Sequence, residues 1–265
     1  GKVMISISEG GLETSKKGAL SATGDRGSDS AFNEGMFEEW SVGDANNISF
    51  HTPADILPFG VKASIAHAPS TAANSNASVN AVAAANSGVI TQPNDTGAVY
   101  TTGSLANAGR SFTQYQVSAA PIDGLALGAS YGNFGGAAGN TGQDGEGGAW
   151  YATYQLGNTK LGYSKSYVAL PTVKTATTYE SVLGHKYSAL IAVNDDLSIS
   201  YGVEKSEATH MLATTADVEQ EVTQIAAAYT TGGLTLAVSM NDFENASYTA
   251  NKDVTATVFN ISMAF

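Results

Sequence analysis

The stretch from Glu221 to Met240, EVTQIAAAYTTGGLTLAVSM, has the pattern of a complete β-hairpin. Apolar residues occupy alternate positions on both sides of a Gly232-Gly233 pair, which is typical of a tight turn between two strands. A period of two puts one set of side chains on each face of a strand. The row that includes Gln224 and Ser239 is too polar for a sandwich core, so we predict that the apolar row faces outward. The apolar row comprises Ile225, Ala227, Tyr229, Leu234, Leu236, Val238 and Met240.

The same alternation recurs along the chain and predicts about twelve strands. The connections between them alternate between short, such as Pro121 to Asp123, and long, such as Ser206 to Asp217. Alternating connection lengths are typical of a barrel that spans a bilayer, with turns on one side and loops on the other. Aromatic residues in the outward rows fit the belts found at membrane interfaces, although β-propensity alone could also place them there. These residues are Tyr131, Trp150, Tyr154, Tyr163, Tyr167, Tyr187, Tyr201, Tyr229 and Phe265.

Composition narrows the class of protein further. The 265 residues show no interdomain linker, so residues 1–265 are predicted to form a single domain. No uninterrupted apolar run approaches the roughly 18 residues of a membrane helix. A formal net charge of −12 and the lack of basic runs argue against nucleic acid as a partner. The absence of cysteine excludes disulfides and thiolate sites.

Motifs for catalysis or metal binding are weak. Ser130 lies in a Gly-x-Ser-x-Gly pattern, but this motif requires a strand, a turn and then a helix, and the glycine-rich residues that follow cannot form one. The four histidines show no ligand spacing. We therefore expect no catalytic residue, no metal site and no cofactor, with loop calcium as the one alternative. The acidic residues that could bind calcium are Asp144, Glu146, Asp195 and Asp196, which do not reproduce a known calcium loop.

The chain resembles the general porins of Gram-negative bacteria, the trimeric diffusion channels of the outer membrane. The resemblance depends on the opening Gly1-Lys2-Val3 strand, a long acidic loop after it, the segment NNISFHTPADILPFGVKASIAHAP at residues 46–69, and the last strand ending at Phe265. It implies a transmembrane antiparallel up-and-down barrel in which the first strand here corresponds to the fifth of sixteen. We expect either that a leader has been removed or that the sequence begins partway through a longer protein.

The resemblance also implies a pore architecture. Residues 11–45 would be the loop that folds into the barrel and constricts the pore, and residues 68–109 would be a long extracellular loop. Acidic candidates in the constriction loop face basic candidates on the barrel wall, an arrangement that creates a transverse field across a narrow pore. The loop candidates are Glu34, Glu38, Glu39, Asp44, Arg26, Lys16 and Lys17. The wall candidates, which parity sends inward, are Lys62, Arg110, Lys160 and Lys186.

These observations predict a multi-pass channel of the bacterial outer membrane that passes ions and small hydrophilic solutes by diffusion, with a weak preference for cations and no enzymatic activity. The resemblance implies lipid, lipopolysaccharide and two further copies of the chain, as a homotrimer, as partners. Two alternatives remain open: a non-conducting adhesive surface barrel, and a secreted all-β hydrolase that uses Ser130 or a carboxylate pair. The solute and the radius of the constriction do not follow from the sequence.

Overall fold

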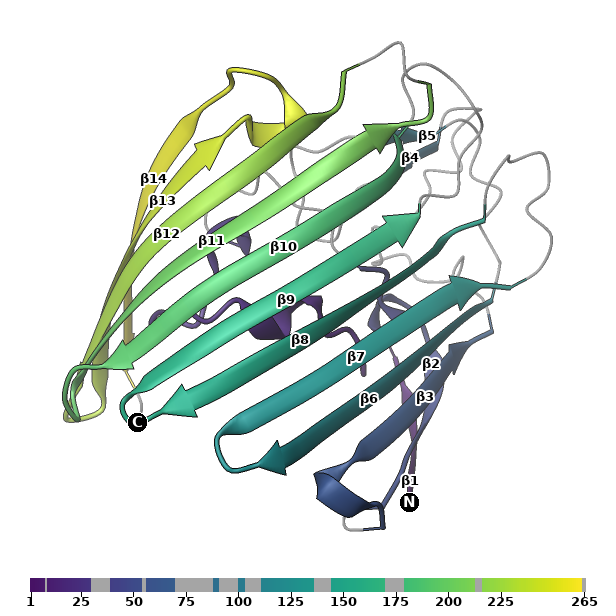
Figure 1. Cartoon of the computed structure of the whole chain (residues 1–265), viewed down its shortest axis with the longest axis horizontal. Helices are drawn as coiled ribbons and strands as arrows, with labels where there is room; N and C mark the ends of the chain where they lie inside the picture. The colour runs from purple at the N-terminus through teal and green to yellow at the C-terminus, as the bar shows by residue number, and fades with distance from the viewer. Residues whose placement is uncertain are drawn as a thin grey trace.

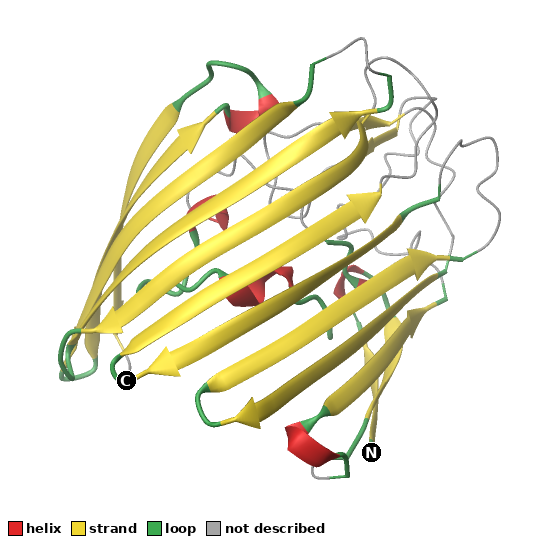
Figure 2. Cartoon of the chain, viewed as in Figure 1, coloured by secondary structure: helices red, strands yellow, loops and turns green. Residues whose placement is uncertain are grey.

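A computed structural model gives the fold of the chain. It describes residues 1–7, 9–29, 39–53, 56–69, 88–90, 100–102, 111–135, 144–169, 179–212 and 216–263. Strands dominate this part of the chain, and its helices are short 3-10 turns (Figure 2). None of the described helices has the length and apolar content needed to cross a membrane.

Twelve strands form one antiparallel sheet in which each strand pairs with its neighbours in sequence (Figure 1). This order confirms the predicted all-β, up-and-down architecture. The first and last strands are the two edges of the sheet. The strands are β1 (Lys2–Ser6), β2 (Asn47–His51), β3 (Lys62–Ala68), β6 (Phe112–Ile122), β7 (Leu125–Phe134), β8 (Glu146–Leu156), β9 (Thr159–Ala169), β10 (Tyr179–Ala192), β11 (Leu197–His210), β12 (Val218–Thr231), β13 (Leu234–Glu244) and β14 (Val254–Met263).

Short turns gather at one end of the sheet, which we call the turn side, and the strand ends that the longer connections join lie at the other end (Figure 1). At the β12–β13 turn, Gly232 and Gly233 have φ values of +56° and +84°. Two consecutive residues with positive φ make the turn whose twist matches paired strands, and glycine adopts them without steric cost. The hairpin read from the sequence is therefore confirmed, with Ile225 paired to Met240 and Tyr229 to Leu236.

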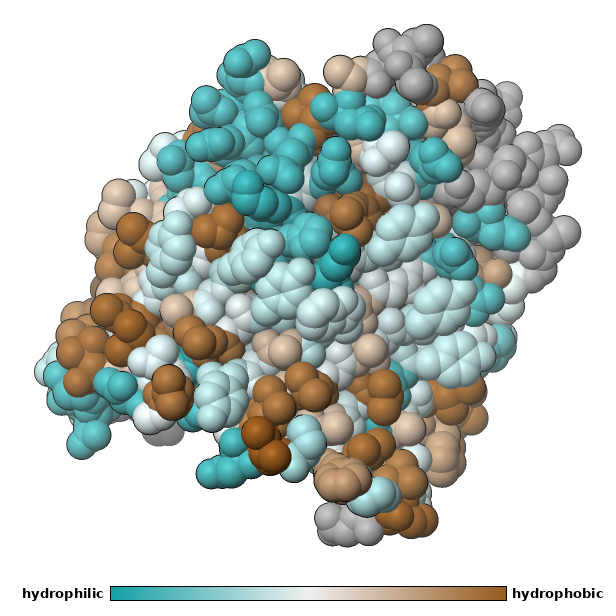
Figure 3. All heavy atoms as spheres, in the orientation of Figure 1, coloured by the Kyte–Doolittle hydropathy of each residue, from teal (hydrophilic) through white to brown (hydrophobic). Residues whose placement is uncertain are grey.

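The two faces of the sheet confirm the predicted parity. Ile225 and Met240 are more than half exposed, whereas Gln224, Ala226 and Ser239 on the opposite face are at most 5% exposed. The convex outer face carries an apolar zone near the turn side, then a pale band rich in tyrosine and tryptophan, then a hydrophilic zone (Figure 3). This order fits an interfacial aromatic belt on a lipid-facing wall. Phe265 lies outside the described residues.

Two predicted boundaries were wrong. Strand β6 continues through Pro121 to Ile122, and its register against β7 shifts between Ala119 and Ile122. A bulge tolerates proline because the residue there need not donate to the ladder. Strand β11 extends to His210 rather than ending before Ser206, because cross-strand pairing with β10 and β12 overrides its weak apolar pattern.

The connection from β1 to β2 lies inside the curve of the sheet, where Figure 1 shows its purple trace behind the strands. It contains the short helices η1 (Ser15–Gly18), η2 (Gly27–Asp29) and η3 (Val42–Asp44). The connection from β3 to β6 contains a separate pair of short strands, β4 (Gly88–Ile90) and β5 (Tyr100–Thr102). The remaining short helices are η4 (Pro58–Gly60) and η5 (Ala246–Tyr248).

Candidate functional site

Residues 12–28 form a segment, which we call the brace, that crosses the inner face of the sheet from β6 to β12. At β6, Leu12 N donates to Gln114 Oε1 at 3.2 Å, and Gln116 Nε2 donates to Leu12 O at 3.0 Å. At β7 and β8, Thr14 Oγ1 lies 2.7 Å from Ser130 Oγ and donates to the carbonyl of Ala149 at 3.2 Å. The brace thus begins with at least one hydrogen bond to each strand that it passes.

Inward-facing serines continue this series on the next strands. On β9, Ser164 Oγ donates to the carbonyl of Ser15 at 2.7 Å. On β10, Ser188 Oγ donates to Gly18 O at 2.6 Å and accepts from the backbone N–H of Leu20 at 2.9 Å. These hydroxyls satisfy backbone groups that the irregular brace would otherwise leave buried without partners.

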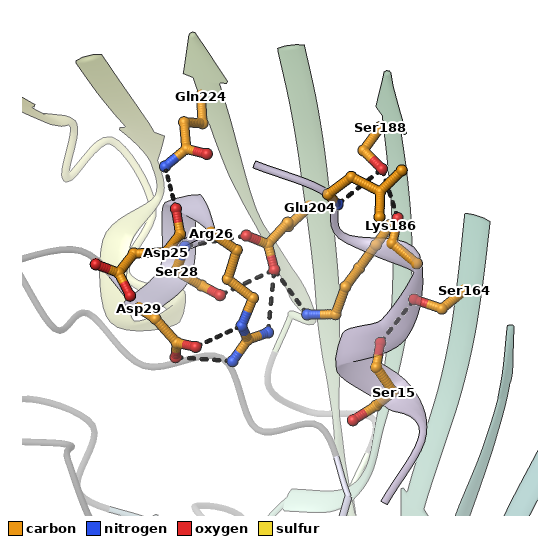
Figure 4. A network of polar contacts seen from close by, with 12 residues as sticks. Ser15, Asp25, Arg26, Ser28, Asp29, Ser164, Lys186, Ser188, Glu204 and Gln224 are labelled. Carbon is orange, nitrogen blue, oxygen red and sulfur yellow. Dashed lines mark hydrogen bonds and ion pairs between the residues drawn. The ribbon is translucent and has the colours of Figure 1, made fainter. Parts of the chain in front are cut away.

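The remaining contacts lead the brace to β12. On β11, Ser200 Oγ accepts from the backbone N–H of Ala22 at 2.8 Å. On β12, Gln224 Nε2 donates to the carbonyl of Asp25 at 3.0 Å (Figure 4). The brace therefore follows a fixed path across the wall, held by small polar side chains of successive strands.

Two glycines allow the brace to approach β9 closely. A Cβ added to Gly18 would overlap the backbone of Tyr163 and Ser164, and one added to Gly162 would overlap the carbonyl oxygen of Gly18. Each glycine thus removes a side chain at the point where two backbones meet. The crossing depends on both positions.

A buried ion network anchors the far end of the brace (Figure 4). Arg26 forms a two-pronged pair with Asp29, with Nε to Oδ2 at 2.7 Å and Nη2 to Oδ1 at 2.8 Å. Its Nη1 also donates to Glu204 Oε2 of β11 at 3.2 Å. Lys186 Nζ of β10 donates to the same Glu204 oxygen at 2.7 Å. Ser28 completes the shell of Glu204 through its backbone N–H at 3.0 Å and its hydroxyl at 2.9 Å.

Formal charges in this network balance. Arg26 and Lys186 supply two positive charges, and Asp29 and Glu204 supply two negative ones. Burial alone would raise the pKa of Asp29, but the hydrogen bond and positive charge of Arg26 outweigh burial and lower it. The network attaches the brace to the wall and contributes little net field to the interior.

Glu39 anchors the other part of the connection. Its carboxylate accepts from the backbone N–H of Thr14 at 3.0 Å and of Ser15 at 3.2 Å, and from the hydroxyl of Ser130. The side chain is 9% exposed, and this burial raises the pKa of Glu39, although the three hydrogen bonds oppose the shift. Nearby, Trp40 packs edge-on against Phe134 at 5.1 Å between ring centroids.

The other predicted site residues divide into three groups. Lys16 and Lys17 on η1 are exposed, and Lys62 and Lys160 occupy inward rows of β3 and β9, exposed and half-buried respectively. Asp44 ends η3. The predictions for Glu34, Glu38 and Arg110 fall outside the described residues.

The sequence did not indicate Glu204 or the serines that hold the brace. Glu204 stands in an inward row two positions from Gly202 and Ser206, where a charge on a buried face could have been recognised from parity alone. The serines had no such signal, because serine is common in every strand of this chain and only the path of the brace selects them.

Ser130 lies within β7, and the strand continues past it to Phe134 instead of turning into a helix. Its hydroxyl contacts Glu39 and Thr14, so it serves as a structural partner of the connection. The described residues contain no cluster of three or more histidine or acidic side chains suited to a metal ion. At the start of β8, Glu146 accepts a hydrogen bond from the hydroxyl of Tyr131 at 2.6 Å.

No protein-family model and no curated protein sequence matches this chain. Solved structures do match it. They include an anion-selective porin from Comamonas acidovorans (TM-score 0.56, 13% identity) and OmpF of Salmonella typhi in a complex with daunomycin (0.56, 14%). A third is the outer-membrane channel DcaP of Acinetobacter baumannii (0.54, 9%).

These matches cover 82–83% of this chain and 60–61% of the matched chains. The chain therefore has the fold of the outer-membrane porins, which confirms the resemblance at the level of architecture. It spans about 60% of the length of these neighbours.

Proposed function

We propose that this chain forms the wall of a water-filled outer-membrane channel through which ions and small hydrophilic solutes diffuse, without catalysis. One observation carries the proposal: the sheet exposes apolar rows on its convex face and holds a polar brace against its concave face. A wall with lipid-compatible residues outside and hydrogen-bonding residues inside is what a porin requires. The porin fold of the matched structures supports the same function.

We propose that the complete channel closes the two edges of the described sheet, β1 and β14. A sheet with open edges leaves unpaired backbone groups, which a bilayer does not tolerate, so the barrel must close. We propose closure as a sixteen-stranded barrel with four further strands between β14 and β1. A barrel of about sixteen strands is wide enough to leave an aqueous channel, whereas side chains fill the interior of a smaller barrel. Assembly as a homotrimer in contact with lipopolysaccharide belongs to the same proposal.

We further propose that the turn side faces the periplasm and that the long connections face outward. Residues 68–109 would then be an extracellular loop, and residues 11–45 would form the constriction. The contacts of the brace with β6 to β12 support the second assignment, because they hold this connection inside the curve of the sheet.

The ion selectivity of the proposed channel depends on which charged side chains remain without a partner. Glu39 is buried, and Arg26 and Lys186 are neutralised by Glu204 and Asp29, so these charges add little to the field in the pore. A weak cation preference then depends on Glu34 and Glu38 together with Asp44, against the basic candidates. The basic candidates outside the buried ion network, which would oppose this preference, are Lys16, Lys17, Lys62, Arg110 and Lys160.

Planar bilayers under a salt gradient test the function and its selectivity. We expect stepwise conductance from the purified full chain, and a reversal potential that indicates a weak preference for cations. The double variant Glu34→Gln with Glu38→Gln should shift the reversal potential toward anions. Lys165→Gln, on the outer face of β9, is the control and should leave it unchanged. Detergent-dissolved protein that folds but never conducts would favour the adhesive-barrel alternative.

A further inference from the structure

Three lysines face the interior between the brace and the turn side of the sheet. Lys2 on β1 pairs with His51 of β2, in the inward row that ends at the buried Ser6. Lys62 on β3 shares the inward row of the fully buried Ala66. Lys160 on β9 lies two positions before Gly162, where the brace crosses. All three therefore face the part of the interior between the brace and the turn side, which we call the turn-side compartment. Lys2 and Lys62 lie near one end of the wall from β1 to β9, and Lys160 lies at the other.

The described strands of this wall place no carboxylate in the compartment. Among the described strand residues, no aspartate or glutamate occupies an inward row between the brace and the turns. Within the same described ranges, no ion pair or hydrogen bond engages the amino groups of Lys2, Lys62 and Lys160. The described acidic residues of this side, Asp123, Asp195 and Asp196, lie in the turns at the rim, where solvent and salt screen them.

The brace closes the compartment without neutralising it. Its ion network contains two cations and two carboxylates, which cancel. Outside this network, the brace carries Lys16 and Lys17 of η1 together with Glu13 and Asp25, so its formal charges are balanced as well. The brace is therefore close to neutral, and the described wall on its turn side carries Lys2, Lys62 and Lys160 without an inward carboxylate.

We propose that the turn-side compartment is an anion-collecting vestibule that binds small multivalent anions of the phosphate class. Unpaired ammonium groups on a concave wall focus the potential and raise the local concentration of counter-ions. Lysine is also an effective phosphate partner as a mobile point charge. The proposal goes beyond diffusion because it gives the channel two unequal entrances, and it rests on the proposed pore for its physiological meaning.

Asymmetric block in planar bilayers tests the vestibule. Tripolyphosphate added to one side and then to the other should interrupt the current more effectively from the turn side, by about tenfold in apparent affinity. The triple variant Lys2→Gln, Lys62→Gln and Lys160→Gln should remove this asymmetry. Lys165→Gln should retain it, because Lys165 lies on the outer face of the strand that carries Lys160.

A second measurement does not need conductance. Broadening of the phosphorus NMR lines of tripolyphosphate by the detergent-dissolved full chain should decrease in the triple variant and persist in Lys165→Gln. Equal block from both sides, or equal broadening by the wild type and the triple variant, would overturn the vestibule. Broadening that depends on the three lysines in a protein that never conducts would retain the anion site and refute the pore.

Discussion

Strands β9 to β12 present side chains alternately to an inner and an outer face, and the two faces differ in which kinds of side chain they bury. Inside, many of the buried side chains are polar or charged, including Ser164, Ser188, Glu204 and Gln224, and they alternate along the inner rows with small apolar ones such as Val168 and Val222. Outside, tyrosine and aliphatic side chains remain around half exposed. Water-soluble sheets bury apolar rows instead. The difference teaches that lipid replaces the core on one face, while the brace satisfies hydrogen bonds on the other.

The largest loss in the free energy of unfolding is expected where a buried charge loses its partner. Glu204→Gln leaves Lys186 and Arg26 without their shared carboxylate, and removing one member of a buried network costs about 3–5 kcal/mol. Urea unfolding in detergent measures this loss. The matched control is Lys205→Gln on the outer face, whose pairs with Glu219 and Glu221 are partly exposed and worth about 1 kcal/mol or less. Similar losses in both variants would contradict the contrast between the faces.

A charge placed on the apolar face gives the next largest effect. Val238→Arg, in the outward row of β13, should lower the free energy of unfolding in lipid by about 2–4 kcal/mol, because arginine must leave water. Its sequence neighbour Ala237 faces inward, and Ala237→Arg should cost clearly less. If Ala237→Arg were as costly as Val238→Arg, the lipid-facing assignment of the outer rows would fail.

The close crossing at β9 should be sensitive to a single methyl group. Gly18→Ala forces the brace away from the backbone of Tyr163, at a cost of about 1–3 kcal/mol. We also expect altered single-channel conductance, because the brace moves within the interior. Gly202→Ala is the control, since its added Cβ would meet atoms only at 3.7 Å or farther. Unchanged conductance in Gly18→Ala would show that the brace does not line the narrowest part of the pore.

The smallest effect concerns the pH dependence of Glu39. Burial raises the pKa of Glu39, so its contribution to stability is present at acid pH and is lost as pH rises through that raised pKa. Glu39→Gln keeps an uncharged hydrogen-bonding group, so it should match the wild type at low pH and become relatively more stable at neutral pH. Asp29 has the opposite sign, because its lowered pKa means that stability is lost as pH falls. Unfolding curves between acid and neutral pH distinguish the two contributions.

Periodicity predicted most of the fold because each strand carries its own signal. The apolar row from Ile225 to Met240 predicted the two strands, the turn between them and the outward face. The structure confirms all three, because Ile225 pairs with Met240 and both side chains are exposed. The end of β11 was missed because Glu207 and the residues around it have no apolar period and are strands only through their neighbours. Local pattern therefore predicts strands well along the apolar outward rows and poorly at strand ends that lack such a row.

The candidate site was predictable only in part. The sequence indicated that residues 11–45 contain concentrated charge, and parity placed Lys62, Lys160 and Lys186 in inward rows, as observed. It could not indicate that Arg26 and Lys186 share Glu204, residues separated by up to 178 positions. Such pairing depends on the path of the brace.

By itself the sequence determined the strands, their parity, the hairpin turns and the sorting of connections, since each depends on neighbouring residues and a period of two. Tertiary structure alone decided which charges remain free. It buried Glu39 against Ser130, neutralised Arg26 and Lys186, and left Lys2, Lys62 and Lys160 unpaired. The physical reason is that a charge acts through its nearest partners and the dielectric around it, and both are set by contacts distant in sequence.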